Sequence, residues 1–326
     1  MFTQRAADRL VAGGQFRISR VIGSAFLCVG LLEILAAQTP KRPRIVGISQ
    51  IALFTHDSDK SRAYYGNFLG LEELHPLKAS DGPHSTMLFR INDRQYVELI
   101  PEQAEHTDRL SHISLQTDDI EALRRYLSSK DIAVPQHAHR DKLGILSFSV
   151  TDPEGHSIEM LQYTPHALIL RTQEKSNGAK PISDRMAHAG LIVTNLPAEY
   201  SFYTDILGFK ETYRGSMSGT ALSWVNLRVP DGDDYIEFML YKEALDPAHR
   251  GGAHHLCLQV QDVPSSVADL ESRPYYRQYD HPMQIHLGVN RKRQVNLFDP
   301  DGTRLELMEP HTIDGKPVPS STAPPP

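Results

Sequence analysis

The sequence predicts an α+β fold built from four βαβββ units. The segment from Ile48, ISQIALFTHDSDKSRAYYGNFLGLEE, aligns without a gap with the segment from Met186, MAHAGLIVTNLPAEYSFYTDILGFKE, at an offset of 138 residues. The turn TDPEG begins at Thr151 and returns as FDPDG at Phe298, 147 residues later. A chain of 326 residues is long enough for two domains, so we interpret the repeat as a duplication.

Each aligned segment has the pattern of an alternating strand, a helix of about 11 residues and a second strand. Asp57 or Ser58 can cap the first helix, and Pro197 suits the first turn of the second. Gly70 and Gly208 stand where a left-handed residue commonly ends a helix. Further strands are expected around 85–91, 95–100, 220–229 and 233–241. The remaining units begin at LSHISLQTDDIEALRRYL and AHHLCLQVQDVPSSVADL, and each ends with the strand after the repeated turn.

The repeat predicts a first domain at residues 45–164 and a second at 185–311. Residues 165–184 are polar and rich in helix and strand breakers, which is typical of a linker with at most one short strand. Residues 312–326 are rich in proline, so we expect a disordered tail that does not pack.

The first 37 residues have the pattern of an export signal. Four arginines precede an apolar run at 21–37, and small residues near Ala37 offer a cleavage site. The run is short and contains Glu33, so no stable membrane span is expected once the leader is cleaved. The protein is therefore predicted to be exported, periplasmic or secreted; an uncleaved anchor or a disordered leader is the alternative.

Charge and cysteine content argue against a nucleic-acid-binding protein and against a fold held by disulfides. Removing the leader lowers the net charge from −6 to −8, and no basic surface favours nucleic acid. Cys28 lies in the leader and only Cys257 remains, so the mature chain has no internal disulfide. A lone strand cysteine such as Cys257 is usually a small core residue.

Strand alternation places eight nitrogen or oxygen donors on sheet faces opposite those that a helix can cover. In MAHAGLIV, His188 shares its face with Met186 and Gly190, and the residues between them point the other way. In AHHLCLQV, His255 lies on the donor face and His254 on the covered face, so His255 is the better ligand. The donors are Gln50, Glu98, His112 and Glu159 in the first half, and His188, Glu237, His255 and Glu306 in the second.

The repetition of the four donor positions favours metal binding. Carboxylates on an enclosed sheet face are costly unless they are paired or bound to metal. A salt bridge to Arg228 or Arg304 is the alternative in the second half. Arg291, Lys292 and Arg293 form either a clamp for an anionic substrate or, more commonly for such a run, a solvated loop.

With these donors, the phrases YYGNFLGLEE and SFYTDILGFKE, and the two Asp-Pro-acid-Gly turns, residues 45–310 resemble the vicinal oxygen chelate (VOC) superfamily. That superfamily includes glyoxalase I, extradiol ring-cleaving dioxygenases, fosfomycin-resistance enzymes and metal-free bleomycin-binding proteins. The resemblance implies two glyoxalase-like domains whose curved, cup-shaped mixed sheets surround a divalent metal ion. The second-half donors fit a His/Glu/His/Glu ligand set, and the first-half donors its Gln/Glu/His/Glu variant. The sites form within each half or, in a crossed arrangement, combine Gln50 and Glu98 with His255 and Glu306.

The donors suit Zn, Ni, Co, Mn or Fe(II). The resemblance implies a small-molecule substrate with vicinal oxygens and glyoxalase-like lyase or isomerase chemistry, with Glu237 or Glu306 as the base. An exported protein would lack access to cytosolic glutathione adducts, so the substrate is expected to differ from that of glyoxalase I.

Two alternatives remain open. His188, His255 and Glu306 would supply the Fe(II) triad of a ring-cleaving dioxygenase. Such members typically carry a tyrosine ten residues before the final glutamate, where this chain has Asn296 and Ser149, and a histidine nineteen before, whereas His286 and His139 stand twenty before. The second alternative is a non-catalytic protein that binds or sequesters a small molecule.

Overall fold

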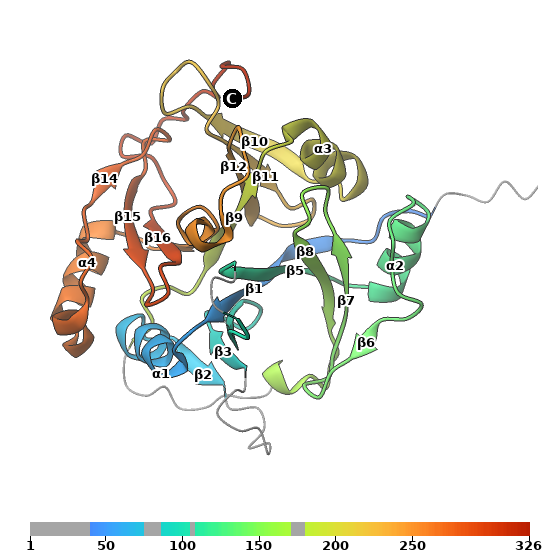
Figure 1. Ribbon diagram of the computed structural model, residues 1–326, viewed down its shortest axis with the longest axis horizontal. Helices are drawn as coiled ribbons and strands as arrows, with labels where there is room; N and C mark the ends of the chain where they lie inside the picture. The colour runs from blue at the N-terminus through green and yellow to red at the C-terminus, as the bar shows by residue number, and fades with distance from the viewer. Residues whose placement is uncertain (1–39, 75–85, 105–107, 171–179) are drawn as a thin grey trace, which may run out of the picture. The chain divides into compact units, whose positions relative to one another are not determined.

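Each half of the described chain forms one curved, eight-stranded mixed sheet (Figure 1). The computed structural model describes residues 40–74, 86–104, 108–170 and 180–326. The strands of the first sheet are β1 (Ile45–Thr55), β2 (Glu72–Leu74), β3 (Met87–Arg90), β4 (Tyr96–Pro101), β5 (Leu110–Thr117), β6 (His139–Arg140), β7 (Ile145–Thr151) and β8 (Ser157–Tyr163). Those of the second are β9 (Met186–Val193), β10 (Lys210–Gly215), β11 (Trp224–Arg228), β12 (Tyr235–Leu240), β13 (His255–Gln259), β14 (His286–Leu287), β15 (Arg293–Phe298) and β16 (Arg304–Met308).

Both sheets have the same strand order. The first runs β2-β3-β4-β1-β5-β8-β7-β6, and the second runs β10-β11-β12-β9-β13-β16-β15-β14. The antiparallel pairs β1 with β5 and β9 with β13 join two four-stranded units at the centre of each sheet. A helix follows the first strand of every unit. The predicted α+β class and the four βαβββ units are confirmed.

The helices begin and end largely as the sequence predicts. They are α1 (Ser58–Arg62) with the π-helical η1 (Ala63–Phe68), α2 (Ile120–Ser128), α3 (Leu196–Ser201) with the π-helical η3 (Phe202–Ile206), and α4 (Val263–Ser272) with η5 (Pro274–Gln278). Two separate 3-10 turns are η2 (Leu168–Leu170) and η4 (Pro247–Gly252). The Asp57 side chain caps α1, Pro197 lies in the first turn of α3, and Gly70 and Gly208 have positive φ angles. The π turns were not predicted.

The two halves share a continuous hydrophobic core. Buried side chains such as Ile51 in β1 and Leu191 in β9 belong to the same cluster. Helices from different halves also meet there, since the ring of Tyr275 in η5 stacks on that of Phe68 in η1 with centroids 5.1 Å apart. Burial of apolar side chains therefore stabilises the association of the two halves.

A β-bulge moves side chains at the start of the first strand in each half. Pairing is irregular between Ile48 and Gln50 in β1, and just before His188 in β9. Met186 consequently packs into the core, while Ala187 joins His188 on the other face, in a cluster with Cys257. The prediction that Met186 shares the face of His188 is wrong, because alternation holds only where the pairing is regular.

The repeated Asp-Pro-acid-Gly turns tie the two halves together. In both turns the first aspartate accepts hydrogen bonds from two backbone N–H groups of the turn. The second acid then reaches the other half. Glu154 Oε1 accepts the N–H of Thr194 at 2.7 Å, just before α3, and Asp301 Oδ1 accepts that of His56 at 3.0 Å, just before α1. The same contact made in both directions explains why the chain repeats this turn.

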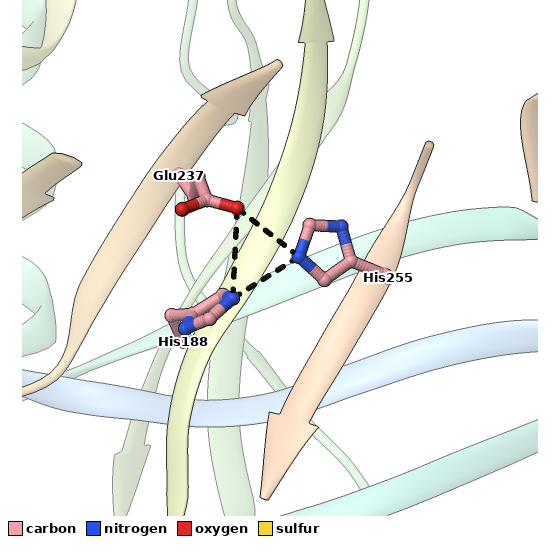
Figure 2. Close-up of side chains that lie close together, drawn as sticks. All are labelled: His188, Glu237 and His255. Atoms are coloured by element: carbon pink, nitrogen blue, oxygen red, sulfur yellow. Dashed lines mark hydrogen bonds and ion pairs between the residues drawn. The ribbon is translucent and has the colours of Figure 1, made fainter. Parts of the chain in front are cut away.

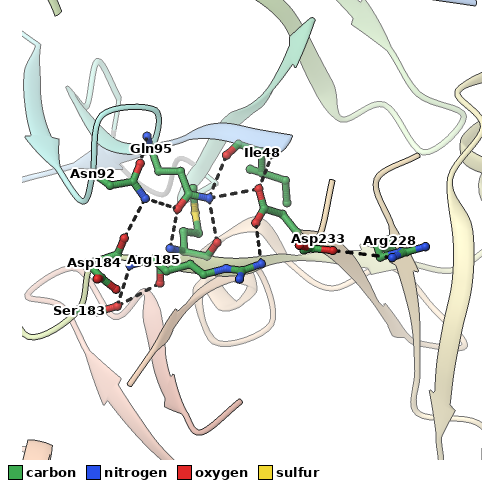
Figure 3. Close-up of polar contacts among 10 residues, drawn as sticks. Ile48, Asn92, Gln95, Ser183, Asp184, Arg185, Arg228 and Asp233 are labelled. Carbon is green, nitrogen blue, oxygen red and sulfur yellow. Dashed lines mark hydrogen bonds and ion pairs between the residues drawn. The ribbon is translucent and has the colours of Figure 1, made fainter. Parts of the chain in front are cut away.

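A buried amide joins the first strands of the two halves (Figure 3). Gln95 lies just before β4, and its Oε1 accepts the N–H of Met186 at 2.9 Å while its Nε2 donates to the Met186 carbonyl at 2.8 Å. The same Nε2 lies 3.3 Å from the carboxylate of Asp234, which accepts the N–H of Ile48 at 3.1 Å. These bonds hold β9 against the first half.

The C-terminal tail corrects one expectation. The N–H of Ser321 donates to the Arg214 carbonyl at 2.9 Å, and the N–H of Leu222 donates to the Pro324 carbonyl at 2.7 Å. Ala323 packs against the hydrophobic core. The prediction that residues 312–326 do not pack is wrong, because the edge strand β10 offers unpaired backbone groups that need no hydrophobic pattern in their partner.

Two other expectations concern the linker and the leader. The described part of residues 165–184 contains η2 and no strand. The leader at 1–37, with its predicted cleavage, lies outside the described residues. In the described part of the chain, no helix has the length and apolar character needed to cross a bilayer.

Candidate metal centre

Four consecutive strands of the second sheet bring its predicted donors together. In the order β12, β9, β13 and β16 they carry Glu237, His188, His255 and Glu306. The donors form two adjacent rows across the sheet. Gly190 lies between Glu237 and His255 in one row, and Cys257 lies between His188 and Glu306 in the other. A small central residue in each row leaves space above the sheet in which the outer side chains can meet.

The glycine in the first row makes room for an imidazole. A Cβ atom at Gly190 would lie 2.1 Å from two atoms of the His255 ring. That ring is completely buried, and its Nδ1 lies 2.7 Å from the carbonyl oxygen of Ala253. The Nδ1 atom also lies 2.8 Å from Arg304 Nη2, which only donates, so a carbonyl and a guanidinium compete for this nitrogen while Nε2 faces the other donors.

The donor atoms are spaced like ligands of a single ion. His188 Nε2 lies 3.0 Å from His255 Nε2 and 3.4 Å from Glu306 Oε2. Glu237 Oε2 lies 3.3 Å from His255 Nε2 and 3.8 Å from His188 Nε2 (Figure 2). Ligands about 2.1 Å from one metal, at octahedral or tetrahedral angles, are about 3.0–3.4 Å apart. His188, Glu237 and His255 offer ligand atoms that all lie within 4.8 Å of one another, and Glu306 joins them through His188. These imidazoles and carboxylates suit a divalent ion such as Zn, Ni, Co, Mn or Fe(II).

The electrostatics of the centre favour anionic Glu237 and Glu306 and a neutral His255. Burial tends to raise the pKa of Glu306, but the hydrogen bond and charge of His188 outweigh it and lower that pKa to about 2. At Glu237, burial likewise tends to raise the pKa, but the charge of His188 and the hydrogen bond and charge of His255 outweigh it and lower that pKa. Burial and then the Arg304 guanidinium lower the pKa of His255. Anionic carboxylates and neutral imidazoles are the forms that coordinate a cation.

The salt-bridge alternative does not match the contacts. Arg228 pairs with Asp233 at 3.8 Å, and Arg304 Nη2 lies 2.8 Å from His255 Nδ1. Within the described residues, the ion pairs of Glu237 and Glu306 involve the two histidines. Among the described residues, the two carboxylates thus have no arginine within ion-pair distance, and a metal cation would neutralise their charge.

The sequence assigned Cys257 to the core, but the structure places it in the centre. Its thiol is completely buried in the row between His188 and Glu306, and these three side chains offer ligand atoms within 4.8 Å of one another. Burial, then the charges of Glu306 and Glu237, raise the pKa of the thiol. The signal was present in the sequence, since Cys257 alternates in phase with His255. His254, on the other face, contacts Asp108 at 3.7 Å instead.

A cavity of about 470 Å³ opens over the second-half donors. Its wall includes Asn296, which lies opposite Glu306 on β15, and His286 from β14. The other residues that line it include Met217, Trp224, Met239, Leu287, Asn290 and Gln294. In the basic run, Arg291 pairs with Asp314 and Arg293 with Glu309. These pairs favour the loop interpretation of that run over the clamp.

The first-half donors also lie on four consecutive strands, but their contacts are looser. His112 Nε2 lies 3.5 Å from Glu98 Oε2 and 3.8 Å from Glu159 Oε2. The Ser114 hydroxyl donates to Glu159 at 2.6 Å and lies 3.5 Å from the Gln50 oxygen. Burial, followed by the charge of Glu159, raises the pKa of Glu98 to about 7. Since each sheet contains all four of its own donors, the crossed arrangement is wrong.

A buried apolar cluster lies beside the first-half donors. Leu88 lies opposite Glu98 in the strand register, where Asn226 lies opposite Glu237 in the second half. The segment after β8 adds Ala167 and Ile169 to this cluster. Its buried members are Leu74, Leu88, Tyr96, Ile145, Leu161, Ala167 and Ile169. We refer to these seven residues as the apolar plug.

Comparisons with known proteins agree with the duplicated fold. The family model described as Glyoxalase/Bleomycin resistance protein/Dioxygenase superfamily matches residues 47–160 and 185–307. Comparison with curated protein sequences finds no match.

Solved structures show the same fold. The 2,3-dioxygenase LapB from Pseudomonas sp. KL28 is 18% identical, with a TM-score of 0.62, over 85% of this chain and 98% of that one. The Mn(II)-bound glyoxalase from Novosphingobium aromaticivorans is 16% identical, with a TM-score of 0.62, over 87% and 89%. An extradiol ring-cleaving dioxygenase from B. fuscum is 16% identical, with a TM-score of 0.62, over 87% and 76%.

Proposed function

Because the chain belongs to the Glyoxalase/Bleomycin resistance protein/Dioxygenase superfamily, we propose that it is a divalent-metal-dependent enzyme whose metal centre lies in the second half. The proposed ligands are His188, Glu237, His255 and Glu306. The observation that carries the proposal is the convergence of these four donors, with separations of 3.0–3.8 Å, beside a cavity of about 470 Å³. A cavity of that size suits a small molecule.

The proposed reaction is glyoxalase-like lyase or isomerase chemistry on a small substrate with two vicinal oxygens. A divalent metal bound to these residues would supply a Lewis acid that stabilises negative charge on the substrate oxygens. Glu237 and Glu306 both line the cavity, so either carboxylate can accept a proton from the substrate and return it. The apolar side chains of Trp224 and Met239 form part of the cavity wall and limit the access of water.

Oxygen-dependent ring cleavage is the second candidate. His286 favours it, since this imidazole lines the cavity close to the sequence position where ring-cleaving members carry a histidine. Asn296 disfavours it, because it stands opposite Glu306 where those members carry a tyrosine.

We also propose that the protein is exported to the periplasm or secreted, which rests on the arginines and the apolar run of residues 1–37. N-terminal sequencing of protein recovered outside the cytoplasm should then find a start after Ala37. A start at Met1 in the cytoplasmic fraction would contradict export.

Metal content and reaction type can be tested with the same preparation. Protein purified without chelators is analysed for Zn, Ni, Co, Mn and Fe, then assayed with 2-oxoaldehyde thiol adducts and with catechols while dissolved oxygen is recorded. Product without oxygen uptake supports the lyase or isomerase, and oxygen uptake with ring opening supports the dioxygenase. Absence of bound metal, with no rise in melting temperature on adding these ions, would instead indicate a non-catalytic binding protein.

Two variants locate the proton acceptor. Glu237→Gln and Glu306→Gln keep the side-chain shape but remove the base. The variant that retains metal but loses at least about 100-fold in turnover identifies the acceptor. If both retain metal and turnover, neither carboxylate is the base.

A further inference from the structure

A second group of metal-ligand side chains lies where the halves meet, away from the cavity. Asp152 and His156 come from the turn after β7, and Glu199 comes from α3 in the other half. These three side chains offer ligand atoms that all lie within 4.8 Å of one another. His156 Nδ1 lies 2.8 Å from Asp152 Oδ2, and the Tyr203 hydroxyl donates to the same oxygen at 3.3 Å.

One carboxylate oxygen of this group lacks a partner. Glu199 is completely buried, and its Oε1 accepts the N–H of Glu154 at 2.7 Å. Its Oε2 is buried and, with both carboxylates ionised, has no hydrogen-bond partner among the described residues. Asp152 is also buried, so two carboxylates face each other with a single imidazole beside them. Burying such charges is costly unless a cation or a shared proton compensates them.

The opposite side of the interface shows that the fold does not require this arrangement. By the two repeat offsets, Ser61 corresponds to Glu199 and Thr303 to His156. There Asp299 accepts the Tyr65 hydroxyl at 3.0 Å, and the Ser61 hydroxyl donates to Asp301 at 3.4 Å. Both replacements that distinguish the first side introduce side chains able to bind metal.

We propose that Asp152, His156 and Glu199 bind a second divalent transition-metal ion, which links the two halves. One imidazole with two carboxylates is a donor set suited to Zn, Mn, Co or Ni. The Tyr203 hydroxyl or water completes the coordination. Since the ligands come from both halves, the ion stabilises their association by binding only the folded chain.

Metal stoichiometry tests the proposal with Zn²⁺ as the probe. The full chain is stripped with chelator, reloaded with Zn²⁺ and analysed for zinc per chain. The triple variant His112→Ala/His188→Ala/His255→Ala removes histidine ligands from the donor sets of both halves and should retain one equivalent. Adding Glu199→Gln to it should remove that equivalent and abolish the rise in melting temperature caused by Zn²⁺. Asp299→Asn, added instead of Glu199→Gln, is the matched control and should leave the zinc count unchanged.

The contrary outcomes are equally clear. If the triple variant binds no zinc, or if its equivalent survives Glu199→Gln, the proposal is wrong. If no zinc binds and Glu199→Gln has an unchanged or raised melting temperature, Asp152 and Glu199 share a proton. The side-chain amide of the Glu199→Gln variant can then donate the hydrogen bond that the protonated carboxyl group donates in the wild type. Should Glu199→Gln fail to fold, His156→Gln gives the same readout at a side chain nearer the surface. Because the cavity donors are already removed, these results do not depend on the function proposed above.

Discussion

The two halves of this chain share one strand order, yet their donors differ in spacing and in the residues that lie beside them. In the second half, Asn226 stands opposite Glu237 and a cavity of about 470 Å³ lies over the centre. In the first half, Leu88 takes the corresponding place and belongs to the apolar plug. A duplicated sheet can therefore keep its donor pattern while a residue beside the donors changes from polar to apolar.

A single methyl group accounts for another part of the difference. His255 lies beside Gly190 in the strand register, whereas His112 lies beside Ala52. The His255 side chain is 0% exposed and the His112 side chain is 19% exposed. Since a Cβ at Gly190 would collide with the His255 ring, the methyl group of Ala52 excludes the same ring position in the first half. We infer that the second half carries the chemistry.

Removing one histidine from each half is the strongest test of that assignment. His255→Ala should remove the metal beside the cavity and lower turnover by at least about 100-fold, since both depend on this ligand. His112→Ala should leave turnover unchanged, because the apolar plug lies beside its sheet face. Zinc or manganese analysis and steady-state kinetics of both variants measure the effect. Equal loss of turnover in both would show that the halves act together.

The glycine can be exchanged between the halves. Gly190→Ala should displace the His255 ring and weaken metal binding by about 10–100-fold, the scale of a misoriented ligand. Ala52→Gly is the reciprocal change and should let His112 move inward, raising metal affinity in the first half. Competition with a metallochromic chelator measures both affinities. Unchanged affinity in Gly190→Ala would mean that the ring has another place to lie.

The sequence could predict which side chains share a sheet face, because strand alternation is a property of neighbouring residues. Two-residue alternation and two constant offsets placed His255, Glu237 and Glu306 on one face, where the structure brings them close to His188 or to each other. Alternation failed at Met186, where a bulge depends on pairing with another strand.

Other features depend on contacts that no local pattern encodes. The packing of Ala323, the folding of Ile169 onto the first sheet, and the meeting of Asp152 with Glu199 join segments far apart in the chain. Cys257 was on the correct face, but a lone cysteine has no pattern that separates a site from a core.

The apolar plug itself gives the next prediction. Leu88→Ala should destabilise the protein by about 2–5 kcal/mol, because it leaves a cavity among buried neighbours. Asn226→Ala at the corresponding second-half position should cost less, since its Oδ1 already lacks a partner and the cavity lies nearby. Urea unfolding curves of the two variants compare these costs. A larger loss in Asn226→Ala would mean that the first-half sheet is the more tolerant one.

The two repeated turns differ in how their first aspartate is compensated, and this predicts a difference in pH dependence. Asp152 has the imidazole of His156 at 2.8 Å, whereas Asp299 has the Tyr65 hydroxyl and backbone N–H groups. Burial, followed by the charge of Asp301, raises the pKa of Asp299 to about 7 from 3.8.

Between those two pKa values the folded chain binds a proton at Asp299 that the unfolded chain has released, so stability falls as pH rises. The slope from this group is at most about 1.4 kcal/mol per pH unit, and the loss is complete above pH 7. Asp299→Asn keeps the side chain neutral and should remove this slope. Melting curves from pH 4 to 8, taken as the difference between wild type and Asp299→Asn, measure it. A difference independent of pH would mean that Asp299 does not change its protonation between pH 4 and 8.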